Sequence, residues 1–373
     1  MFFVRIQSLR NKIEEIDLAL SCSRPDILCI TEHWLNKGEE KIIKLDDYDM
    51  ATAFCRENIT KGGSAIFVRE SMRYMMIDVK ELERELDFEC SAVMVHNLII
   101  LCVYRSPKGN VGGFLESLEE FFKRYSMKHS KILVCGDFNI DFLSTDFRKK
   151  TVKRKLKGLL DEYGFRNILK NATRVTFSSE TMIDYLVTNI EEAKVISVQD
   201  SIDLALSDHH MQSVEINVGK IRAENTFRTF RVVNEVLQKK FNDLLGKETW
   251  EELKLETDFN TKFRIFHDKY KNIYDSIFIE KRVNVGKKPK NKWMSKGLKI
   301  SSKNMRCLNS ERKKSSDLQV MQHFLEYKRI YRKLLRQAKR KYHDECIQNA
   351  DNKSKATWKI VNSELGKTKK QKF

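Results

Sequence analysis

Proline and glycine are both scarce in this sequence, with 3 prolines and 14 glycines among 373 residues. A low-complexity or linker-like protein contains many more of these two residues, so both classes are excluded. Apolar residues make up 41% of the chain and include 22 phenylalanines. The length allows two or more domains of ordinary size, and the composition allows at least one substantial hydrophobic core.

Long apolar segments are also missing. The longest run, LIILCVY at 98–104, is far shorter than the roughly 20 residues that a membrane-spanning helix needs. The N-terminal MFFVRIQSLRNK is apolar over too few residues to act as a signal peptide. We therefore expect a protein that is neither secreted nor inserted in a membrane.

The 8 cysteines form no Cys-x-x-Cys pair, and several of them lie inside apolar, strand-like runs. This pattern is typical of buried, reduced thiols in an intracellular protein. His209 and His210 are adjacent and would face opposite sides of a strand, so no zinc site is indicated.

Acidic residues become rare in the last quarter of the chain. Residues 1–220 contain 31 Lys and Arg against 34 Asp and Glu, and residues 221–280 contain 11 of each kind. Residues 281–373 contain 28 basic and 7 acidic residues, a net charge of +21. From charge alone, a nucleic-acid-binding segment and a solvated basic helix without a specific partner explain this excess equally well.

Hydrophobic periodicity divides the chain into two regions. Up to residue 220, short β-rich runs alternate with expected helices over 8–20 (with Ser8 as a possible N-cap), 113–126 and 152–163. This alternation favours a mixed α/β layer architecture over a purely parallel sheet. From 221 onward, helical segments with Phe and Trp lead to a basic linker around Pro289.

A long helix is predicted over 317–348, with basic residues on its other faces. Its expected apolar side chains are Phe324, Tyr327, Tyr331, Leu334, Leu335, Ala338 and Tyr342.

Polar side chains occur where several predicted strands end or begin, and such positions often bind ligands in α/β sheets. They are Glu32, Tyr104, Asp137, Asn139, Asp184, Asp208 and His209. Each has an ordinary explanation by itself; the Gly136–Asn139 segment, for example, is typical of a turn. Together they supply carboxylates for Mg²⁺, an amide for a water or phosphate oxygen, and an Asp–His pair beside a phosphate. This set favours phosphodiester hydrolysis.

Five segments carry a family resemblance: PDILCITEHWL, VYRSP, GDFNID, MIDYLVTN and SDHH, in this order within residues 1–220. Together they resemble the exonuclease–endonuclease–phosphatase superfamily. The similarity is greatest to the apurinic-type endonuclease domain of jockey-like non-LTR retrotransposon polyproteins. The stretch from NKWMSKGLKI to SELGK is similar to the linker that follows this domain. No Tyr/Phe-x-Asp-Asp motif occurs, so no polymerase domain is predicted.

The resemblance implies a four-layer α/β sandwich of two mixed sheets flanked by helices, followed by a basic helical extension. The implied domains are an endonuclease domain at 1–220, a helical connector at 221–285 and a basic helical linker at 286–373. The implied cofactor is Mg²⁺, with Mn²⁺ as a substitute. DNA and the RNA of the element would be the partners, and a chromosomal substrate implies the nucleus, with the cytoplasm as a second location.

The resemblance also implies a role for each candidate residue. Glu32 would bind the metal, and Asp137 would activate an attacking water that Asn139 positions.

The resemblance further implies that Tyr104 and His209 contact the scissile phosphate. Asp184 would support the site, and Asp208 would orient His209 and reach the metal.

One position departs from the family pattern. The family's first strand ends in an asparagine that helps to hold the metal, and the equivalent residue here is Arg5. Its positive charge falls where a cation is expected. Either the true start lies upstream and the local sequence has decayed, or Arg5 points elsewhere and the activity is weakened. Two hypotheses follow: a metal-dependent DNA endonuclease that nicks its target, and a catalytically impaired remnant that binds nucleic acid through its basic C-terminal region. A phosphatase is a third, which the basic tail disfavours.

Overall fold

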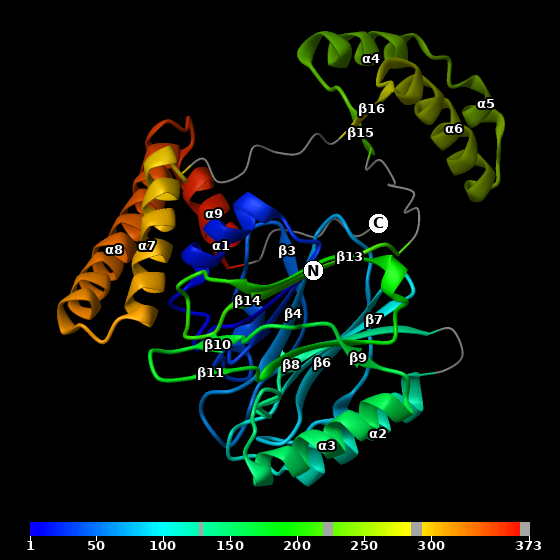
Figure 1. Cartoon of the computed structure of the whole chain (residues 1–373). Helices are drawn as coiled ribbons and strands as arrows, with labels where there is room; N and C mark the ends of the chain where they lie inside the picture. The colour runs from blue at the N-terminus through cyan, green and yellow to red at the C-terminus, as the bar shows by residue number, and fades with distance from the viewer. Residues whose placement is uncertain (127–129, 219–226, 285–292, 366–373) are drawn as a thin grey trace. The chain divides into compact units, whose positions relative to one another are not determined.

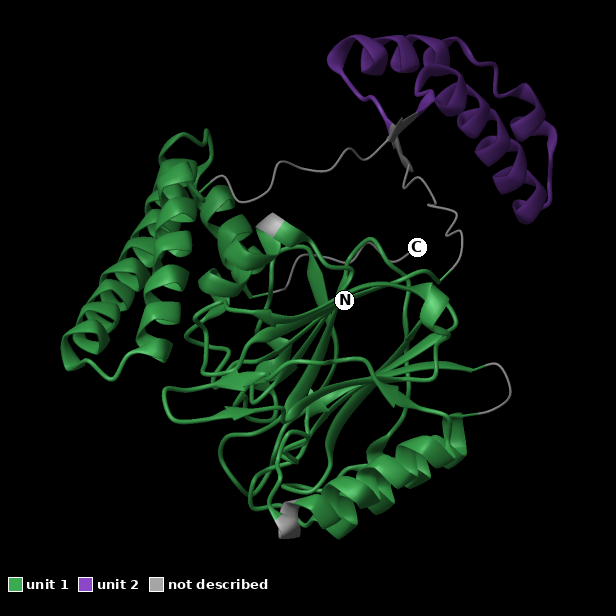
Figure 2. Ribbon diagram, viewed as in Figure 1, with its two compact units in different colours: residues 1–219, 291–373 green, residues 220–290 purple. Residues whose placement is uncertain are grey.

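The computed structural model describes residues 1–126, 130–218, 227–284 and 293–365. It separates into two compact units, coloured green and purple in Figure 2. The first unit comprises residues 1–219 and 291–373, and the second comprises residues 220–290. The C-terminal basic helices therefore belong to the same unit as the α/β region.

A six-stranded mixed sheet forms one half of the first unit (Figure 1). Its strands are, in order, β13 (Val195–Ile202), β14 (Met211–Ile216), β1 (Phe2–Arg5), β2 (Ile27–Thr31), β4 (Ser64–Arg69) and β3 (Tyr48–Phe54). β1 and β2 are parallel, and β2 runs antiparallel to β4. The carboxyl ends of β1 and β2 therefore lie at the same edge of this sheet.

A second six-stranded sheet faces the first. Its strands are, in order, β5 (Met75–Met76), β6 (Glu89–Val95), β7 (Leu98–Tyr104), β8 (Lys131–Asp137), β12 (Asp184–Thr188) and β9 (Arg166–Asn167). The predicted hairpin between β6 and β7 turns at His96 and Asn97, whose φ angles are 50° and 36°. β7 and β8 are parallel neighbours, so Tyr104 pairs with Asp137 at the end of both strands.

The two sheets enclose one hydrophobic core and are covered by helices on their outer faces. The inner core combines residues of both sheets, such as Phe3 and Ile66 with Ile100 and Leu186. Helices α2 (Val111–Tyr125) and α3 (Phe147–Glu162) pack on the second sheet, and α1 (Ile13–Ser23) packs on the first (Figure 1). This is the four-layer α/β sandwich that the sequence predicted.

The first helix starts later than its apolar periodicity indicates. Gln7 and Ser8 have φ angles of 52° and 74°, which no helix allows, and α1 begins at Ile13. The Lys12 ammonium bonds to the carbonyl oxygens of Ile6 and Gln7 and so fixes this turn. Ser8 is therefore not the N-cap, because residues 6–12 form a tight loop behind β1 instead.

The C-terminal helices form a small apolar core against the sandwich. They are α7 (Lys296–Lys314), α8 (Leu318–Gln348) and α9 (Lys353–Glu364). Phe324, Tyr331 and Leu335 of α8 are buried with Leu18 of α1 and Ala205, as the predicted apolar face required, whereas Leu334 is 45% exposed.

Polar contacts hold α8 in the same place. The Arg332 guanidinium donates to both carboxylate oxygens of Glu15 at 2.8 and 3.1 Å, and the Lys328 ammonium donates to the Ala205 carbonyl at 2.9 Å. The basic helix is thus a docked part of this unit.

The second unit, taken by itself, is a helical layer closed by a two-stranded ribbon. Its elements are β15 (Phe227–Arg231), α4 (Glu235–Lys247), α5 (Glu251–Leu255), α6 (Phe259–Ile277) and β16 (Glu280–Asn284). Phe241 of α4 packs against Tyr270, Tyr274 and Phe278, at ring-centroid distances of 5.4, 6.0 and 5.5 Å. The predicted basic linker around Pro289 lies outside the described residues.

Several short elements complete the first unit. They are the hairpin β10 (Arg174–Val175) and β11 (Glu180–Thr181) and the 3-10 helices at Glu39–Lys41, Lys80–Leu82 and Glu192–Lys194. Within the described residues, no helix is both long and apolar enough to cross a lipid bilayer.

Gly136 continues strand β8 and does not make the turn that its motif suggested. A Cβ at this position would lie 1.8 Å from the Val103 carbonyl oxygen, because β7 passes close by. The turn begins two residues after the strand, where Asn139 has a φ of 50°. Glycine is thus required at 136 by a close backbone approach.

We predict that Gly136→Ala strongly destabilises the protein, because the added methyl group must push β7 and β8 apart. A loss of about 1–3 kcal/mol, typical of overpacking, is expected in urea or thermal unfolding. Gly158→Ala is the matched control: this site in α3 has open space and should gain about 0.5–1 kcal/mol from better helix propensity. Equal stability of the two variants would contradict the predicted close contact.

Candidate active site

Five strands deliver polar side chains to one edge of the sandwich. The register pairs Asp137 with both Tyr104 and Asp184, so the ends of β7, β8 and β12 are adjacent. Arg5 ends β1, beside Thr31 of β2, and Glu32 follows directly. The predicted residues are therefore brought together by strand pairing, from segments far apart in the chain.

Arg5 points into this group of carboxylates. Its guanidinium lies 2.7 Å from Glu32 Oε1, 3.1 Å from Asp137 Oδ2 and 3.4 Å from Asp208 Oδ1. The side chain is only 11% exposed. Burial opposes the charged form, but the carboxylates of Asp137 and Glu32 outweigh it and raise the pKa of Arg5 above its usual value. The expectation that the Arg5 side chain points elsewhere is therefore wrong.

Glu32 connects Arg5 to the second sheet. The Tyr104 hydroxyl donates a hydrogen bond to Glu32 Oε1 at 2.5 Å, and both side chains are almost fully buried. Burial and the Glu32 charge raise the pKa of Tyr104, so the phenol stays protonated and is a donor. Glu32 itself has a φ of 56°, a left-handed conformation that non-glycine residues rarely adopt and that often marks functional sites.

Asp137 is completely buried at the end of β8. Burial and the neighbouring Asp184 raise the pKa of Asp137 to about 7, although His209 and Arg5 act in the opposite direction. Its Oδ1 accepts a bond from the Asn139 backbone N–H at 3.1 Å. A carboxyl group with a pKa near 7 can act as a general base at neutral pH.

Asn139 is held by a neighbouring loop. Its Nδ2 donates to the Arg105 carbonyl oxygen at 2.6 Å, so the amide orientation is fixed from behind. The Arg105 guanidinium in turn donates to the carbonyl oxygens of Phe138 and Asn139, both at 2.7 Å. Arg105 is a residue that the sequence reasoning missed, although it stands in the VYRSP segment beside Tyr104.

His209 is oriented by Asp184. Its Nδ1 lies 2.7 Å from Asp184 Oδ2, and both side chains are almost completely buried. Burial alone would lower the pKa of His209, but the Asp184 carboxylate overcomes it and raises that pKa. Among the described residues, His209 Nε2 has no hydrogen-bond partner. This arrangement leaves one buried imidazole nitrogen without a partner among these residues.

The expectation that Asp208 orients His209 is wrong. The partner of His209 Nδ1 is instead Asp184, whose Oδ2 lies 2.7 Å away. Asp208 Oδ2 accepts from Arg174 Nε at 2.7 Å, while its Oδ1 faces Arg5. Although burial acts to raise it, the charges of His209 and the bond from Arg174 lower the pKa of Asp208, which stays ionised.

Thr173 is a second residue that no motif in the sequence indicated. Its buried hydroxyl accepts from the backbone N–H groups of Ile183 and Asp184 at 3.2 and 3.1 Å. These bonds fix the first residue of β12, from which the Asp184 carboxylate reaches His209.

The donor set suits Mg²⁺ by chemistry, because the oxygens of carboxylates are the ligands this ion prefers. However, the two predicted ligands, Glu32 and Asp208, both contact the guanidinium of Arg5. Two positive unit charges about 4 Å apart repel by about 4 kcal/mol at an effective dielectric constant of 20, and a divalent ion doubles this. The residues therefore do not fit a divalent cation while Arg5 lies among them.

The fold thus gathers carboxylates, a tyrosine and an Asp–His pair at the strand ends of a two-sheet sandwich. Residues 98–212 match a protein-family model described as endonuclease-reverse transcriptase. The resemblance predicted from the sequence motifs is thereby confirmed, and this segment carries Tyr104, Asp137, Asp184 and His209. No curated protein matches the chain.

Solved structures similar to this chain include three nucleases. A 3′-5′ exonuclease from Neisseria meningitidis has 17% identity and a TM-score of 0.46, over 58% of this chain and 99% of its own. An AP endonuclease from Archaeoglobus fulgidus has 17% identity and a TM-score of 0.46, over 58% and 98%. The endonuclease domain of TRAS1, a telomere-specific non-LTR retrotransposon, has 16% identity and a TM-score of 0.45, over 59% and 98%.

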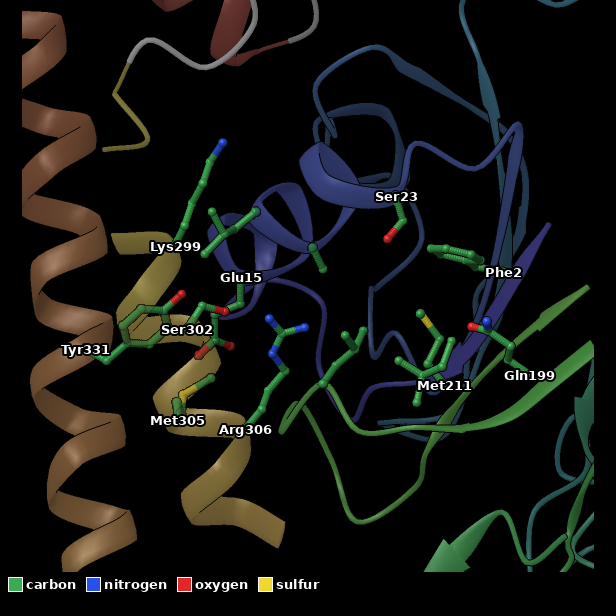
Figure 3. Close-up of a pocket in the computed structure, with 14 residues that line it drawn as sticks. Phe2, Glu15, Ser23, Gln199, Met211, Lys299, Ser302, Met305, Arg306 and Tyr331 are labelled. Atoms are coloured by element: carbon green, nitrogen blue, oxygen red, sulfur yellow. The ribbon is translucent and has the colours of Figure 1, made fainter. Parts of the chain in front are cut away.

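A separate cavity of about 280 Å³ lies where α7 and α8 meet α1 and the first sheet (Figure 3). Glu15, Lys299, Arg306 and Tyr331 are among its lining residues, and none of the candidate active-site residues is. Glu15 is already paired with Arg332. The cavity is therefore a packing gap beneath the C-terminal helices and is distinct from the candidate active site.

We predict that Arg5→Asn destabilises the protein in EDTA by about 3–5 kcal/mol, because three carboxylates lose the cation they share. Millimolar Mg²⁺ should restore much of the melting temperature of the variant and leave that of the wild type nearly unchanged. Differential scanning calorimetry with EDTA or Mg²⁺ measures both effects.

Arg124→Asn is the control, since this exposed arginine pairs with Glu81 and Glu120 at the surface. Its melting temperature should differ little from the wild type in either buffer. If Mg²⁺ raised the melting temperature of the wild type as much as that of Arg5→Asn, Arg5 would not occupy the cation position.

Proposed function

We propose that this chain is a DNA-binding relative of metal-dependent endonucleases whose phosphodiester hydrolysis is strongly impaired by Arg5. The observation that carries the proposal is the set of three contacts from Arg5 to Glu32, Asp137 and Asp208. Glu32 and Asp208 would be the residues that hold a divalent cation, and both already contact this guanidinium. Binding of such an ion would therefore carry the cost of moving Arg5 away from them.

The remaining groups are suited to hold a phosphodiester. His209 has a raised pKa and an Nε2 to which no described residue bonds, so it can donate to a phosphate oxygen. The single proton of the Tyr104 phenol is already donated to Glu32. Asp137 is positioned to accept a proton from a water at this edge. These roles support binding of a DNA backbone, and a chromosomal substrate would place the protein in the nucleus.

An active, Mg²⁺- or Mn²⁺-dependent endonuclease that nicks DNA is the second candidate. It is supported by the convergence of the other predicted residues, since Glu32, Tyr104, Asp137, Asp184 and His209 lie at one edge. This function requires the Arg5 side chain to leave the carboxylates when the cation binds.

The two candidates differ in a plasmid-nicking assay. We predict that Arg5→Asn nicks supercoiled DNA in Mg²⁺ at least about 100-fold faster than the wild type, since each 1.36 kcal/mol removed from the barrier is tenfold in rate. Adding Asp137→Ala or His209→Ala to Arg5→Asn should abolish the activity, which excludes a contaminating nuclease.

Nicking by the wild type at the rate of Arg5→Asn, lost on Asp137→Ala, would establish the second candidate. Absence of nicking by every variant would show that Arg5 is not the cause of the impairment. Both results contradict the proposal.

The basic region supplies a surface for the DNA backbone. Four exposed cations lie on one side of α8 at spacings of four, three and four residues, and we call them the α8 stripe: Arg329, Lys333, Arg336 and Arg340. Arg329 also lies 3.8 Å from Glu326, an exposed pair that contributes little. The half-buried cations of the same helix, Lys328 and Arg332, instead hold it to the sandwich. The α8 stripe is therefore available to phosphates, and RNA of the element would meet the same charges.

We predict that replacing the four residues of the α8 stripe by glutamine weakens duplex DNA binding. The slope of log affinity against log salt concentration should become shallower by about 3–4, because each phosphate contact contributes about 0.9 to the magnitude of this slope. Electrophoretic mobility shifts over a salt series measure this slope. A matched variant replaces four exposed lysines of the second unit by glutamine: Lys239, Lys240, Lys247 and Lys254. This control variant removes the same number of positive charges. If both variants lost the same DNA affinity, net charge and not the α8 stripe would govern binding.

A further inference from the structure

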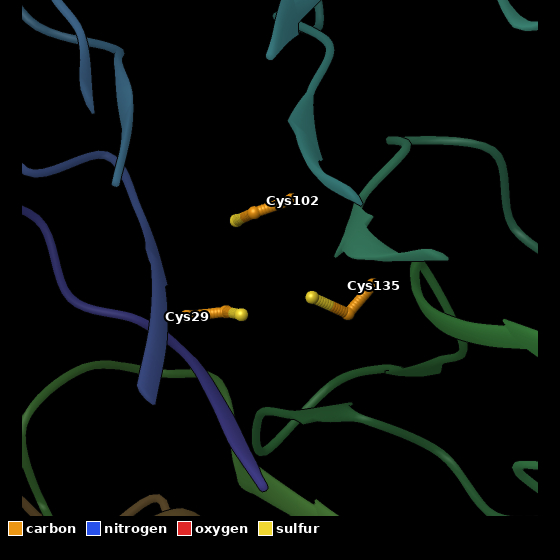
Figure 4. A group of neighbouring side chains, drawn as sticks. All are labelled: Cys29, Cys102 and Cys135. Carbon is orange, nitrogen blue, oxygen red and sulfur yellow. The ribbon is translucent and has the colours of Figure 1, made fainter. Parts of the chain in front are cut away.

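Three cysteines converge in the core between the two sheets. Cys29 comes from β2, Cys102 from β7 and Cys135 from β8, and all three are fully buried. Their sulfur atoms lie within 4.8 Å of one another, and the three side chains extend into the same space (Figure 4). One strand belongs to the first sheet and two belong to the second, so this thiol cluster bridges the sandwich.

The thiol cluster lies one layer below the candidate active site, on strands that also carry it. Cys102 and Cys135 precede Tyr104 and Asp137 by two residues each, and Cys29 precedes Glu32 by three. In a strand, residues two apart point to the same face, so each of these two pairs shares a side of the second sheet. A ligand that draws the three sulfurs together would therefore act on the strands that end in the carboxylates.

The surroundings of the thiol cluster are apolar. The same core contains Phe3, Ile66, Ile100 and Leu133, all without solvent exposure. Buried thiols often act only as small hydrophobic side chains, and one or two cysteines here would need no other explanation. Three sulfurs converging from three strands provide the donors of a trigonal site for a thiophilic ion.

We propose that Cys29, Cys102 and Cys135 form a binding site for one trivalent thiophilic ion of the arsenite class. Binding exchanges ligands without redox change: As(OH)₃ and three S–H groups give As(S)₃ and three waters, as three As–S bonds replace three As–O bonds. Three thiolates neutralise a trivalent ion, so the complex places no net charge in the apolar core. A monovalent copper ion with three thiolates would leave two negative charges there, at a high desolvation cost.

Zinc fits the thiol cluster less well. A structural zinc site is tetrahedral and needs a fourth donor of comparable strength. The further sulfur near the cluster is the thioether of Met1, whose Sδ lies 4.0 Å from Cys29 Sγ. A thioether is a soft ligand that favours copper over zinc, and it is not required by a three-coordinate trivalent ion.

The test uses sodium arsenite with the full chain, both added to the folded protein and present during refolding, so that slow entry into the core does not hide binding. Native mass spectrometry should show one arsenic atom per chain with the loss of three waters. Arsenite should also protect three cysteines from alkylation and raise the melting temperature.

Single variants locate the site. Cys29→Ala, Cys102→Ala and Cys135→Ala should each weaken arsenite binding by about 100-fold or more, since each removes one of three bonds. Cys90→Ala is the matched control, because Cys90 is an equally buried thiol of β6 outside the cluster, and it should bind as the wild type does. Melting curves without arsenite show that each variant is folded.

Failure of the refolded wild type to bind one arsenic would overturn the proposal. So would binding that survives all three variants, which would place the arsenic on other cysteines. Tight 1:1 binding of Zn²⁺ or Cu⁺ that excludes arsenite would also overturn it, since the charge argument would then be wrong.

Discussion

The guanidinium of Arg5 determines the state of the whole candidate site. Glu32, Asp137 and Asp208 come from three different segments and would repel one another at these distances without a cation between them. A metal ion supplies this charge in enzymes that use one. Here a covalently attached side chain supplies it, so the protein can assemble the cluster from its own residues.

The position of that cation depends on strand register. Arg5 and Glu32 follow parallel strands, and Asp137 lies opposite Asp184 and beside Tyr104. Moving any one strand by a residue would turn its side chain to the other face of the sheet and remove it from the cluster. The close approach of β7 and β8 at Gly136 is one of the contacts that fix this register.

Much of the fold and most of the candidate residues could be predicted, because each signal is local. Apolar runs followed by polar residues marked the ends of β2, β7 and β8, and the pair His96–Asn97 marked a hairpin. The errors concern contacts between distant segments. The partner of His209 is Asp184, which is distant in sequence, so the residues next to His209 do not predict it. The first residue of α1 likewise depends on the contacts of the Lys12 ammonium, which the apolar periodicity does not predict.

Arg5 is another case in which contacts between distant segments determine the structure. Its identity is visible in the sequence, but the direction of its side chain depends on the free energy of four charged groups that lie close together and are mostly shielded from solvent. Burying an unpaired arginine costs desolvation free energy, and so does burying three unpaired carboxylates. The arginine and the carboxylates offset these penalties only if the Arg5 side chain points toward them. Arg5 thus provides the cation that stabilises the carboxylates around it. Under the proposed function, the site can for this reason remain well ordered, and a DNA-binding surface around it can persist, without hydrolysis.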